Sequence, residues 1–227
     1  MLKKGNFVKF YAKNSNSLPL KFKTKALLSY FIVWLLFCMV DRLELNVLRT
    51  FLGEDYFNSI ITVESIVGSF SALIGGILCD KIGRKPVITY GFSSLGLAYA
   101  MLGIFPTINL FLYFYCLIDG ISGGFLLMIF TLLIWGDLSD RASREFYYVI
   151  GNIPFFIAEF FRTLLSPKIE VPITAAFFLA SFFLFIAVFP LLYAPETLPE
   201  KVIRERELRE YVKKAKKLRE KYEKTGD

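Results

Sequence analysis

The feature that most constrains this chain is a series of long apolar segments separated by short charged ones. A helix needs about 20 apolar residues to cross a bilayer. Segments of that length lie at 26–48, 57–79, 86–105, 109–136, 146–165 and 171–194. The composition agrees, since 55% of the 227 residues are hydrophobic and the mean hydropathy is +0.52. We therefore predict an all-α membrane protein with six transmembrane helices.

The first segment is the weakest of the series. Its clean apolar run covers only Ala26 to Val40, so a full span requires that DRLELNVL continues the helix. Asp41 and Arg42 follow the run where a secretory signal would have a small-residue cleavage site. We therefore expect this segment to be retained as a transmembrane helix.

Charge divides the chain into three regions. Residues 1–25 carry seven lysines and no acid, and residues 196–227 carry eleven lysines and arginines against eight acids. We expect a basic leader at 1–25, a membrane bundle at 26–195 and a cytoplasmic tail at 196–227. One helical face of the tail is apolar and predicts a C-terminal amphipathic helix that lies on the membrane protein's surface. A membrane-binding or partner-binding role is the alternative.

The basic residues also predict the orientation. Lysine and arginine accumulate in cytoplasmic loops, and the leader, the connection with Lys81, Arg84 and Lys85, the connection with Arg141 and Arg144 and the tail fall on one side. We therefore expect a multi-pass plasma-membrane protein with both termini in the cytoplasm.

Charged side chains at bilayer depth are costly and normally face a protein interior or a water-filled path. The candidate transport-pathway residues are Asp41, Glu44, Glu64, Asp119, Glu159 and Arg162. Asp119 lies deep, in LIDGISGGF, and predicts a functional cavity. Glu159 and Arg162 are three residues apart, so mutual neutralisation is an alternative. Asp41 and Glu44 would lie at the wet interface if the first helix ended early.

The charges follow a period of three helices. Apart from tyrosine, residues 87–105 and 171–194 contain no ionisable group, whereas the other spans do. This pattern suggests two three-helix repeats whose third helices face lipid. Gly120 and Gly124 form a GxxxG pattern, which indicates close helix packing.

The sequence argues against several other functions. It has no histidine, and Cys38, Cys79 and Cys116 fall in or beside apolar runs, so we expect free thiols. No nucleophile–base pair, metal-ligand spacing or phosphate-binding loop is present. We expect neither an enzyme nor a cofactor, a metal site or a nucleic-acid partner.

The connection GGILCDKIGRKP between the second and third spans is short and highly charged. Gly83 suits a tight turn, and Asp80 would place its charge near the start of the next helix. Pro86 suits a helix's first turn. Local physics explains a basic turn but leaves the spacing of Asp80 and Arg84 unexplained.

This connection resembles the signature loop of the major facilitator superfamily, Gly-x-Leu-x-Asp-(Arg/Lys)-x-Gly-Arg-Lys. The matching residues are Gly76, Leu78, Asp80, Lys81, Gly83, Arg84 and Lys85. WGDLSDRASRE resembles the family's Glu-x-x-Pro-x-x-x-Arg-Gly element, with Asp137 for the glutamate and Arg144 for the arginine, although Asp140 and Glu145 replace the proline and glycine. PETLPE resembles the Pro-Glu-(Ser/Thr) element of sugar porters, with Glu196 as its acid.

The resemblance implies that the signature loop is a gate element in a cytoplasmic charge network. Arg84 and Lys85 would meet the acids Asp137 and Glu196, and Arg144 would bridge those acids. Asp80 would contact a neighbouring helix end. An exposed ion pair contributes only ~0–1 kcal/mol, so several pairs together would bias the opening of the inner mouth.

Members of that family usually have twelve spans in two halves, whereas this chain has six. Cys116 stands where the fourth helix of an N-terminal half would carry an arginine, and the leader resembles the loop between halves. We therefore interpret the chain as a C-terminal half, either a half-transporter or a fragment. A charged concavity on one bundle would also need a second six-helix half, from a homodimer or a separate chain.

The function we predict is secondary transport of a small organic solute by alternating access. Asp41 and Asp119 would be the pathway carboxylates, and coupling to a proton is left open. The alternative is a non-transporting scaffold or regulatory subunit that acts through its basic tail, or a truncated transporter fragment. The sequence does not identify the substrate.

Overall fold

The computed structural model describes residues 20–140, 142–165 and 171–198, together with Leu208, Tyr211, Val212 and Ala215. The basic leader before Leu20 and most of the predicted tail helix lie outside the described residues. The described residues therefore cover mainly the membrane bundle and the connection that follows its last helix.

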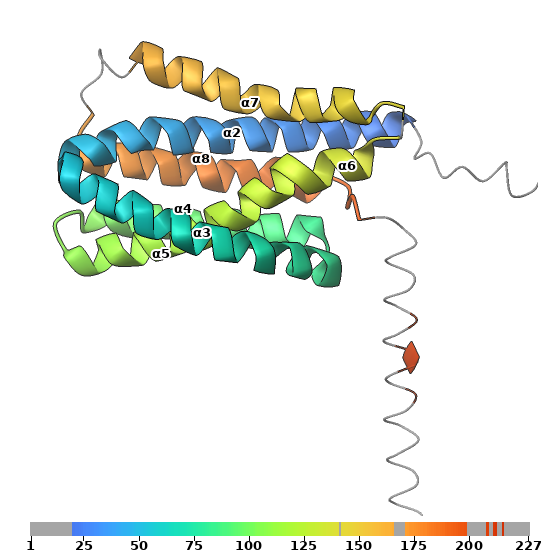
Figure 1. The fold of residues 1–227 in the computed structure, drawn as a ribbon, viewed down its shortest axis with the longest axis horizontal. Helices are drawn as coiled ribbons and strands as arrows, with labels where there is room; N and C mark the ends of the chain where they lie inside the picture. Colours follow the sequence, from blue (N-terminus) through green and yellow to red (C-terminus); the bar gives the residue numbers. More distant parts are fainter. Residues whose placement is uncertain are drawn as a thin grey trace, which may run out of the picture.

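All regular structure in the described residues is helical. The elements in chain order are α2 (Leu20–Leu52), α3 (Glu54–Ile82), α4 (Arg84–Ile104), α5 (Asn109–Met128), the π-helical turn η1 (Ile129–Leu133), α6 (Ile134–Leu138), α7 (Arg144–Leu165) and α8 (Ile173–Tyr193). Helix α5, η1 and α6 form one continuous span. Six helical stretches are long and apolar enough to cross a membrane, so the six-span prediction is confirmed (Figure 1).

The first span is longer than its clean apolar run. Helix α2 continues through Asp41 and Glu44 to Leu52, and Gly53 alone separates it from α3. Gly53 has a φ of 80°, a conformation that favours glycine. The side chains of Arg49 and Glu54 meet across this break at 3.7 Å. Asp41 and Glu44 therefore lie within a full-length helix rather than in a loop.

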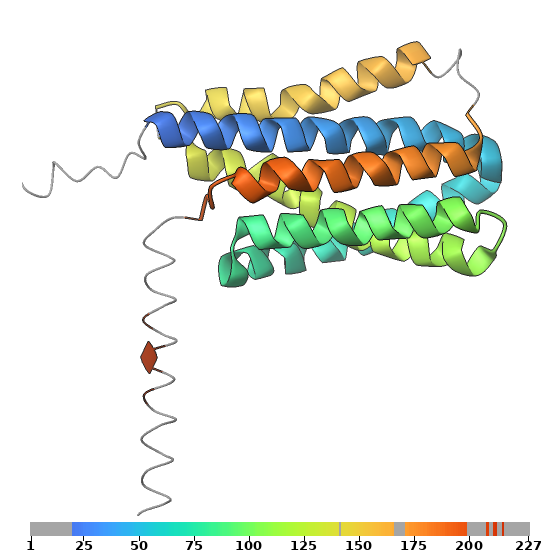
Figure 2. The same ribbon diagram turned by 180° about the vertical axis from the view of Figure 1, so that it is seen from behind.

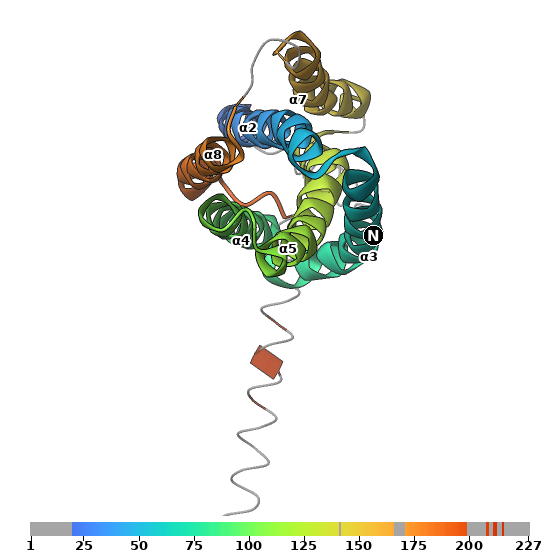
Figure 3. The ribbon, with the colours of Figure 1, turned by 90° about the vertical axis from the view of Figure 1, so that its left-hand side faces the viewer.

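The helices pair in a pattern that repeats. Helix α2 packs on α7 and α8, α3 packs on α5, and α4 packs on α5 and α8. Suppose that each of the first three spans is exchanged with its counterpart among the last three, so that α2 exchanges with α5, α3 with α7 and α4 with α8. The pair α2–α7 then becomes α5–α3, the pair α2–α8 becomes α5–α4, and the pair α4–α8 stays the same. This exchange symmetry is what two three-helix repeats produce. Figures 2 and 3 show α8 beside α2 and α4, and α7 on the outer side of α2.

The prediction that the third helix of each repeat faces lipid is wrong for most of α4, which leaves only part of its surface, including Leu97, exposed. Of its most apolar stretch 56% is buried, against 17% for α3 and α7. Helix α4 runs between α5 and α8 and brings Gly91 and Gly96 against Leu126 and Phe185. An uncharged helix suits lipid and protein interior equally, because both are apolar, so a lack of charge does not predict exposure.

Helix α3 packs against α5 at glycines, as the GxxxG pattern predicted. A Cβ atom at Gly120 would lie 2.9 Å from the carbonyl oxygen of Glu64, and one at Gly124 would collide with the backbone of Gly68. Small residues let helix backbones approach closely in membranes. This contact sets the distance between Glu64 on α3 and Asp119 on α5.

The three cysteines, Cys38, Cys79 and Cys116, are buried free thiols, as predicted. The Sγ atom of Cys116 lies 3.6 Å from the carbonyl oxygen of Ile60. It contributes to the α3–α5 contact as a small, weakly polar group.

Candidate functional site

Two groups of polar side chains are built into the bundle, and the first surrounds the connection between α3 and α4. Gly83 is the only residue between these helices, and its φ of 102° lies where L-residues rarely go. Its N–H donates to the carbonyl of Cys79 at 3.0 Å. The chain therefore reverses within one residue and places Arg84 and Lys85 at the start of α4.

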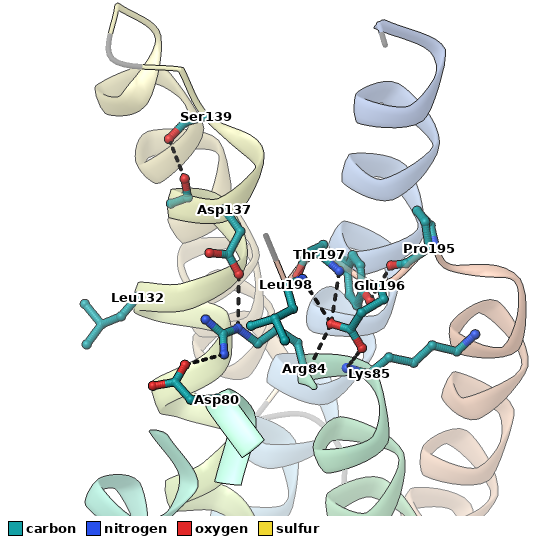
Figure 4. Close-up of polar contacts among 12 residues, drawn as sticks. Asp80, Arg84, Lys85, Leu132, Asp137, Ser139, Pro195, Glu196, Thr197 and Leu198 are labelled. Atoms are coloured by element: carbon teal, nitrogen blue, oxygen red, sulfur yellow. Dashed lines mark hydrogen bonds and ion pairs between the residues drawn. The ribbon is translucent and has the colours of Figure 1, made fainter. Parts of the chain in front are cut away.

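The guanidinium of Arg84 is a buried cation held by two acids. Its side chain is only 6% exposed. The Nε atom donates to Oδ2 of Asp137 at 3.0 Å, and Nη1 donates to Oδ1 of Asp80 at 2.7 Å (Figure 4). A buried charge needs such pairing to offset the loss of water. The predicted contact between Arg84 and Asp137 is therefore present, and Asp80, in the last turn of α3, places its carboxylate against the first residue of α4.

Glu196 does not form the side-chain ion pairs that were predicted. Its Oε1 and Oε2 accept the backbone N–H groups of Arg84 at 2.9 Å and Lys85 at 3.1 Å, not their side chains. Oε1 also accepts the N–H groups of Thr197 and Leu198, both at 3.1 Å. The first N–H groups of a helix have no partner within it and favour negative charge. Glu196 therefore caps the N-terminus of α4 (Figure 4).

Lys85 makes the complementary contact at the end of α8. Its Nζ donates to the carbonyl oxygens of Leu192 at 2.8 Å and Ala194 at 3.1 Å. The last carbonyls of a helix favour a cation. Glu196 and Lys85 thus join the start of α4 to the end of α8 through helix termini. We call Asp80, Arg84, Lys85, Asp137 and Glu196 the charge network.

The expectation that Arg144 bridges the network's acids is wrong. Arg144 is exposed at the first position of α7. Within the described ranges, no ion pair joins it to Asp137 or Glu196. Asp137 is paired with Arg84, and both oxygens of Glu196 accept backbone N–H groups, so neither acid needs a second cation.

The second polar group lies near the other end of the bundle and is centred on Glu44. Glu44 is 6% exposed. Its two carboxyl oxygens accept the hydroxyls of Tyr99 on α4 and Tyr115 on α5. The rings of both tyrosines pack against Phe177 of α8, with centroids at 5.4 and 5.5 Å. Four helices therefore enclose one carboxyl group.

Asp119 and Glu64 adjoin this carboxyl. Asp119 is 7% exposed and lies 3.3 Å from the hydroxyl of Tyr99. A Cβ atom at Gly120, the residue after Asp119, would lie 2.9 Å from the carbonyl oxygen of Glu64, so the two acids lie on facing stretches of α5 and α3. The Oε2 atom of Glu64 is buried and has no donor. We call Glu44, Glu64, Asp119, Tyr99 and Tyr115 the carboxyl cluster.

The carboxyl cluster lies at bilayer depth. At ~1.5 Å of rise per residue, Glu44 is ~12 Å from the end of α2 at Leu52. By the same measure, Glu64 is ~15 Å from the start of α3 and Asp119 ~15 Å from the start of α5. The sequence prediction included these three acids among six pathway residues and missed Tyr99 and Tyr115. A tyrosine within an uncharged span was the available signal, since a buried hydroxyl needs a partner.

Glu159 and Arg162, on α7, are not part of the cluster, whereas Asp41 lies one helical turn before Glu44 on α2. Arg162 donates from Nε to both oxygens of Glu159, at 3.0 and 3.1 Å, so the pair neutralises itself, as the alternative interpretation held. Asp41 lies 3.4 Å from Arg42. The guanidinium of Arg42 also stacks over Phe155 of α7 at 4.4 Å.

These features define a class of fold: a six-span membrane bundle built from two three-helix units whose helix pairings are related by exchange of the two units. No family model and no curated protein matches the sequence at a significant level. Among solved structures, the crystal structure of the human organic anion transporter MFSD10 (TETRAN), a major facilitator protein, matches with a TM-score of 0.63 and 21% identity. The match covers 81% of this chain and 50% of that chain. The chain therefore resembles half of a major facilitator fold.

Proposed function

We propose that the chain is one half of a secondary transporter that moves a small organic solute by alternating access. The observation that carries this proposal is the carboxyl cluster. Three acids at bilayer depth are costly, and stability alone does not require them. In a transporter they would line the solute's route, and the fold's likeness to half of a transporter supports that interpretation.

The proposal includes a second six-helix block. Transporters bind solutes near the bilayer midplane, at the interface between structural repeats. The chain spans about half the length of the transporter it matches. Helices α3 and α7 are the least buried spans. A second copy of the chain or a different chain would cover them and enclose the route.

The charge network would be the gate. Arg84 contacts acids from α3 and from the end of α6, and Glu196 ties α4 to the segment after α8. Interactions of this kind break and reform when helices shift, so they can bias an equilibrium between two conformations. By the basic-residue rule the network faces the cytoplasm.

The test is uptake into liposomes that contain the full chain, alone and with a candidate second half. The probes are fluorescein as an organic anion, tetraethylammonium as an organic cation and glucose as a neutral solute. We expect Asp119→Asn to reduce uptake of the transported probe at least tenfold. Asp55→Asn, at the exposed start of α3, is the matched control and should leave uptake unchanged.

Uptake by neither the single chain nor the pair would contradict the transport proposal. Normal uptake by the Asp119→Asn variant would remove the carboxyl cluster from the route. If cellular function persisted in Asp119→Asn but was lost when residues 199–227 were deleted, the scaffold alternative would replace transport.

A further inference from the structure

Helices α3 and α7 border one side of the bundle, while α4 and α8 pack together on the other (Figure 3). They are the least buried spans, and exchange of the two three-helix units converts one into the other. In an isologous dimer, an element that contacts a second element is itself contacted by that element of the other copy. A twofold axis along the membrane normal on this side would therefore place α3 of each copy against α7 of the other.

The exposed surfaces of α3 and α7 have the same polarity at the same depth. The end of α3 and the start of α7 lie at the end of the bundle where Arg84 contacts Asp137. At ~1.5 Å per residue, Ser65 on α3 lies ~26 Å from this end and Arg162 on α7 lies ~27 Å from it. Polar side chains at matching depth can form hydrogen bonds between helices in a membrane.

Nearer to the charge network both surfaces are apolar. Phe70 on α3 and Phe156 on α7 each lie ~18 Å from that end by the same measure. Their side chains are 68% and 69% exposed. The two surfaces therefore match each other as apolar stretches with polar groups further out.

At the end itself the two helices carry opposite charges. The side chain of Asp80, in the last turn of α3, is 68% exposed. Its Oδ1 accepts Nη1 of Arg84, and no described residue donates to Oδ2. Arg144, the first residue of α7, is exposed and forms no ion pair with a described residue. Each copy thus offers an acid at the end of α3 and a cation at the start of α7.

We propose that two copies of this chain pair about a twofold axis along the membrane normal, with α3 of each copy on α7 of the other. Asp80 then pairs with Arg144 of the partner subunit, twice in the dimer. A second copy is the occupant that fits, because depth, polarity and charge of the two surfaces complement each other within one sequence. The role of this dimer as a complete carrier rests on the proposed function, whereas the pairing does not.

Crosslinking in liposomes tests the arrangement. Two differently tagged forms of the full chain are reconstituted together, both with alanine in place of Cys38, Cys79 and Cys116. One carries Phe70→Cys and the other carries Phe156→Cys, so any product that bears both tags joins two copies. With a bifunctional thiol reagent we expect this product in at least fivefold higher yield than the product of two Phe70→Cys copies.

The matched control pair is Leu97→Cys with Phe182→Cys, on α4 and α8. Both side chains are exposed, at 54% and 58%, but lie on the other side of the bundle. This pair should give no more product than random encounters do. Crosslinking of the control pair as efficient as that of the test pair, or no product from the test pair, would overturn the dimer.

Charge reversal at the interface is a second test. Arg144→Glu should lower the fraction of paired copies at least fivefold, measured by energy transfer between labelled copies in liposomes. Arg144→Lys keeps the charge and should leave that fraction unchanged. Arg144 is exposed and makes no described ion pair within its own chain, so folding should tolerate both changes. An unchanged fraction in Arg144→Glu would contradict its pairing with Asp80.

Uptake measured on the same liposomes separates the dimer from the transport proposal. Crosslinking as expected in liposomes without uptake would contradict transport and leave the dimer standing. Uptake only when a separate second half is added, with no product between copies, would contradict the dimer and leave transport standing.

Discussion

Gly83 shows how one backbone position organises the charge network. Its φ and ψ of 102° and 163° lie in a region that is essentially restricted to glycine. A Cβ atom there would lie 2.7 Å from Oε2 of Glu196. The same residue therefore permits the single-residue turn and leaves room for the carboxylate that caps α4.

The chain contains a matched pair for testing this arrangement. Gly53 has nearly the same conformation, φ 80° and ψ 160°, but nothing lies within 4 Å of its Cβ position. Gly53→Ala should destabilise the fold only by the cost of holding alanine in this backbone conformation, ~1–3 kcal/mol. Gly83→Ala should cost a further ~0.5–2 kcal/mol, because the helix cap is displaced. Unfolding of the two variants in detergent measures the difference.

Equal destabilisation by the two substitutions would contradict the capping role of Glu196. Repeating the comparison in a Glu196→Gln background gives a further check. The glutamine side chain keeps only one oxygen that can accept the backbone N–H groups. Gly83→Ala should then have a smaller effect than in the parent chain, because less of the cap remains to be lost.

At the scale of single residues, the sequence predicted which residues lie close together. It predicted less well which atoms form the hydrogen bonds between them. The loop motif brought Arg84, Asp137 and Glu196 together correctly. It did not show that Glu196 accepts backbone N–H groups, because an unsatisfied helix terminus has no side-chain signature. Arg144 matched the motif but is exposed, since the acids it would bridge are already satisfied.

Among the elements, the π-helical turn η1 has the clearest structural consequence. The N–H of Ile134 bonds to the carbonyl of Ile129, five residues earlier, so the turn holds one residue more than an α-helix would. An extra residue rotates everything after it by ~100°. The turn therefore sets the direction in which Asp137 leaves α6. Such turns are rare and often occur at functional sites.

Deleting Leu132, which is 56% exposed, should convert η1 into α-helix and turn Asp137 away from Arg84. In the parent chain, Asp137→Asn should destabilise the fold by ~3–5 kcal/mol, the range for one partner of a buried pair. In the deletion variant the same substitution should have little effect. Unfolding of all four proteins gives this double-mutant cycle. An unchanged effect in the deletion variant would contradict the proposed role of η1.

The element boundaries were largely predictable because apolar length and glycine or proline breaks mark them. The predicted spans at 86–105 and 109–136 correspond to α4 and to the α5–α6 stretch. The π turn was not predictable, since ILE-PHE-THR-LEU-LEU at 129–133 reads as ordinary helix. The burial of α4 was not predictable either, because its environment depends on which helices flank it.

For the whole molecule, α3, one of the two least buried spans, carries exposed polar residues at helical spacing. On α3 the exposed residues Asn58, Thr62, Ser65 and Ser69 recur every three or four positions and form one stripe. Helix α7 exposes Asn152 on its own surface. A stripe of this kind is expected on a helix that faces water or another protein.

The central claim is that the exposed side of α3 faces an aqueous route completed by a second six-helix block. Cysteine labelling tests it most directly. Ser65→Cys and Leu97→Cys are made in a chain whose native cysteines, Cys38, Cys79 and Cys116, are replaced by alanine. Ser65 and Leu97 are both exposed in this bundle and lie well inside their spans. Each variant is reconstituted with the candidate second half and treated with a charged thiol reagent.

A thiol must reach water to ionise and react. If α3 faces an aqueous route, Ser65→Cys is labelled, whereas Leu97→Cys, on α4, is protected by lipid. Labelling of both positions at the same rate, or protection of Ser65→Cys, would contradict the central claim.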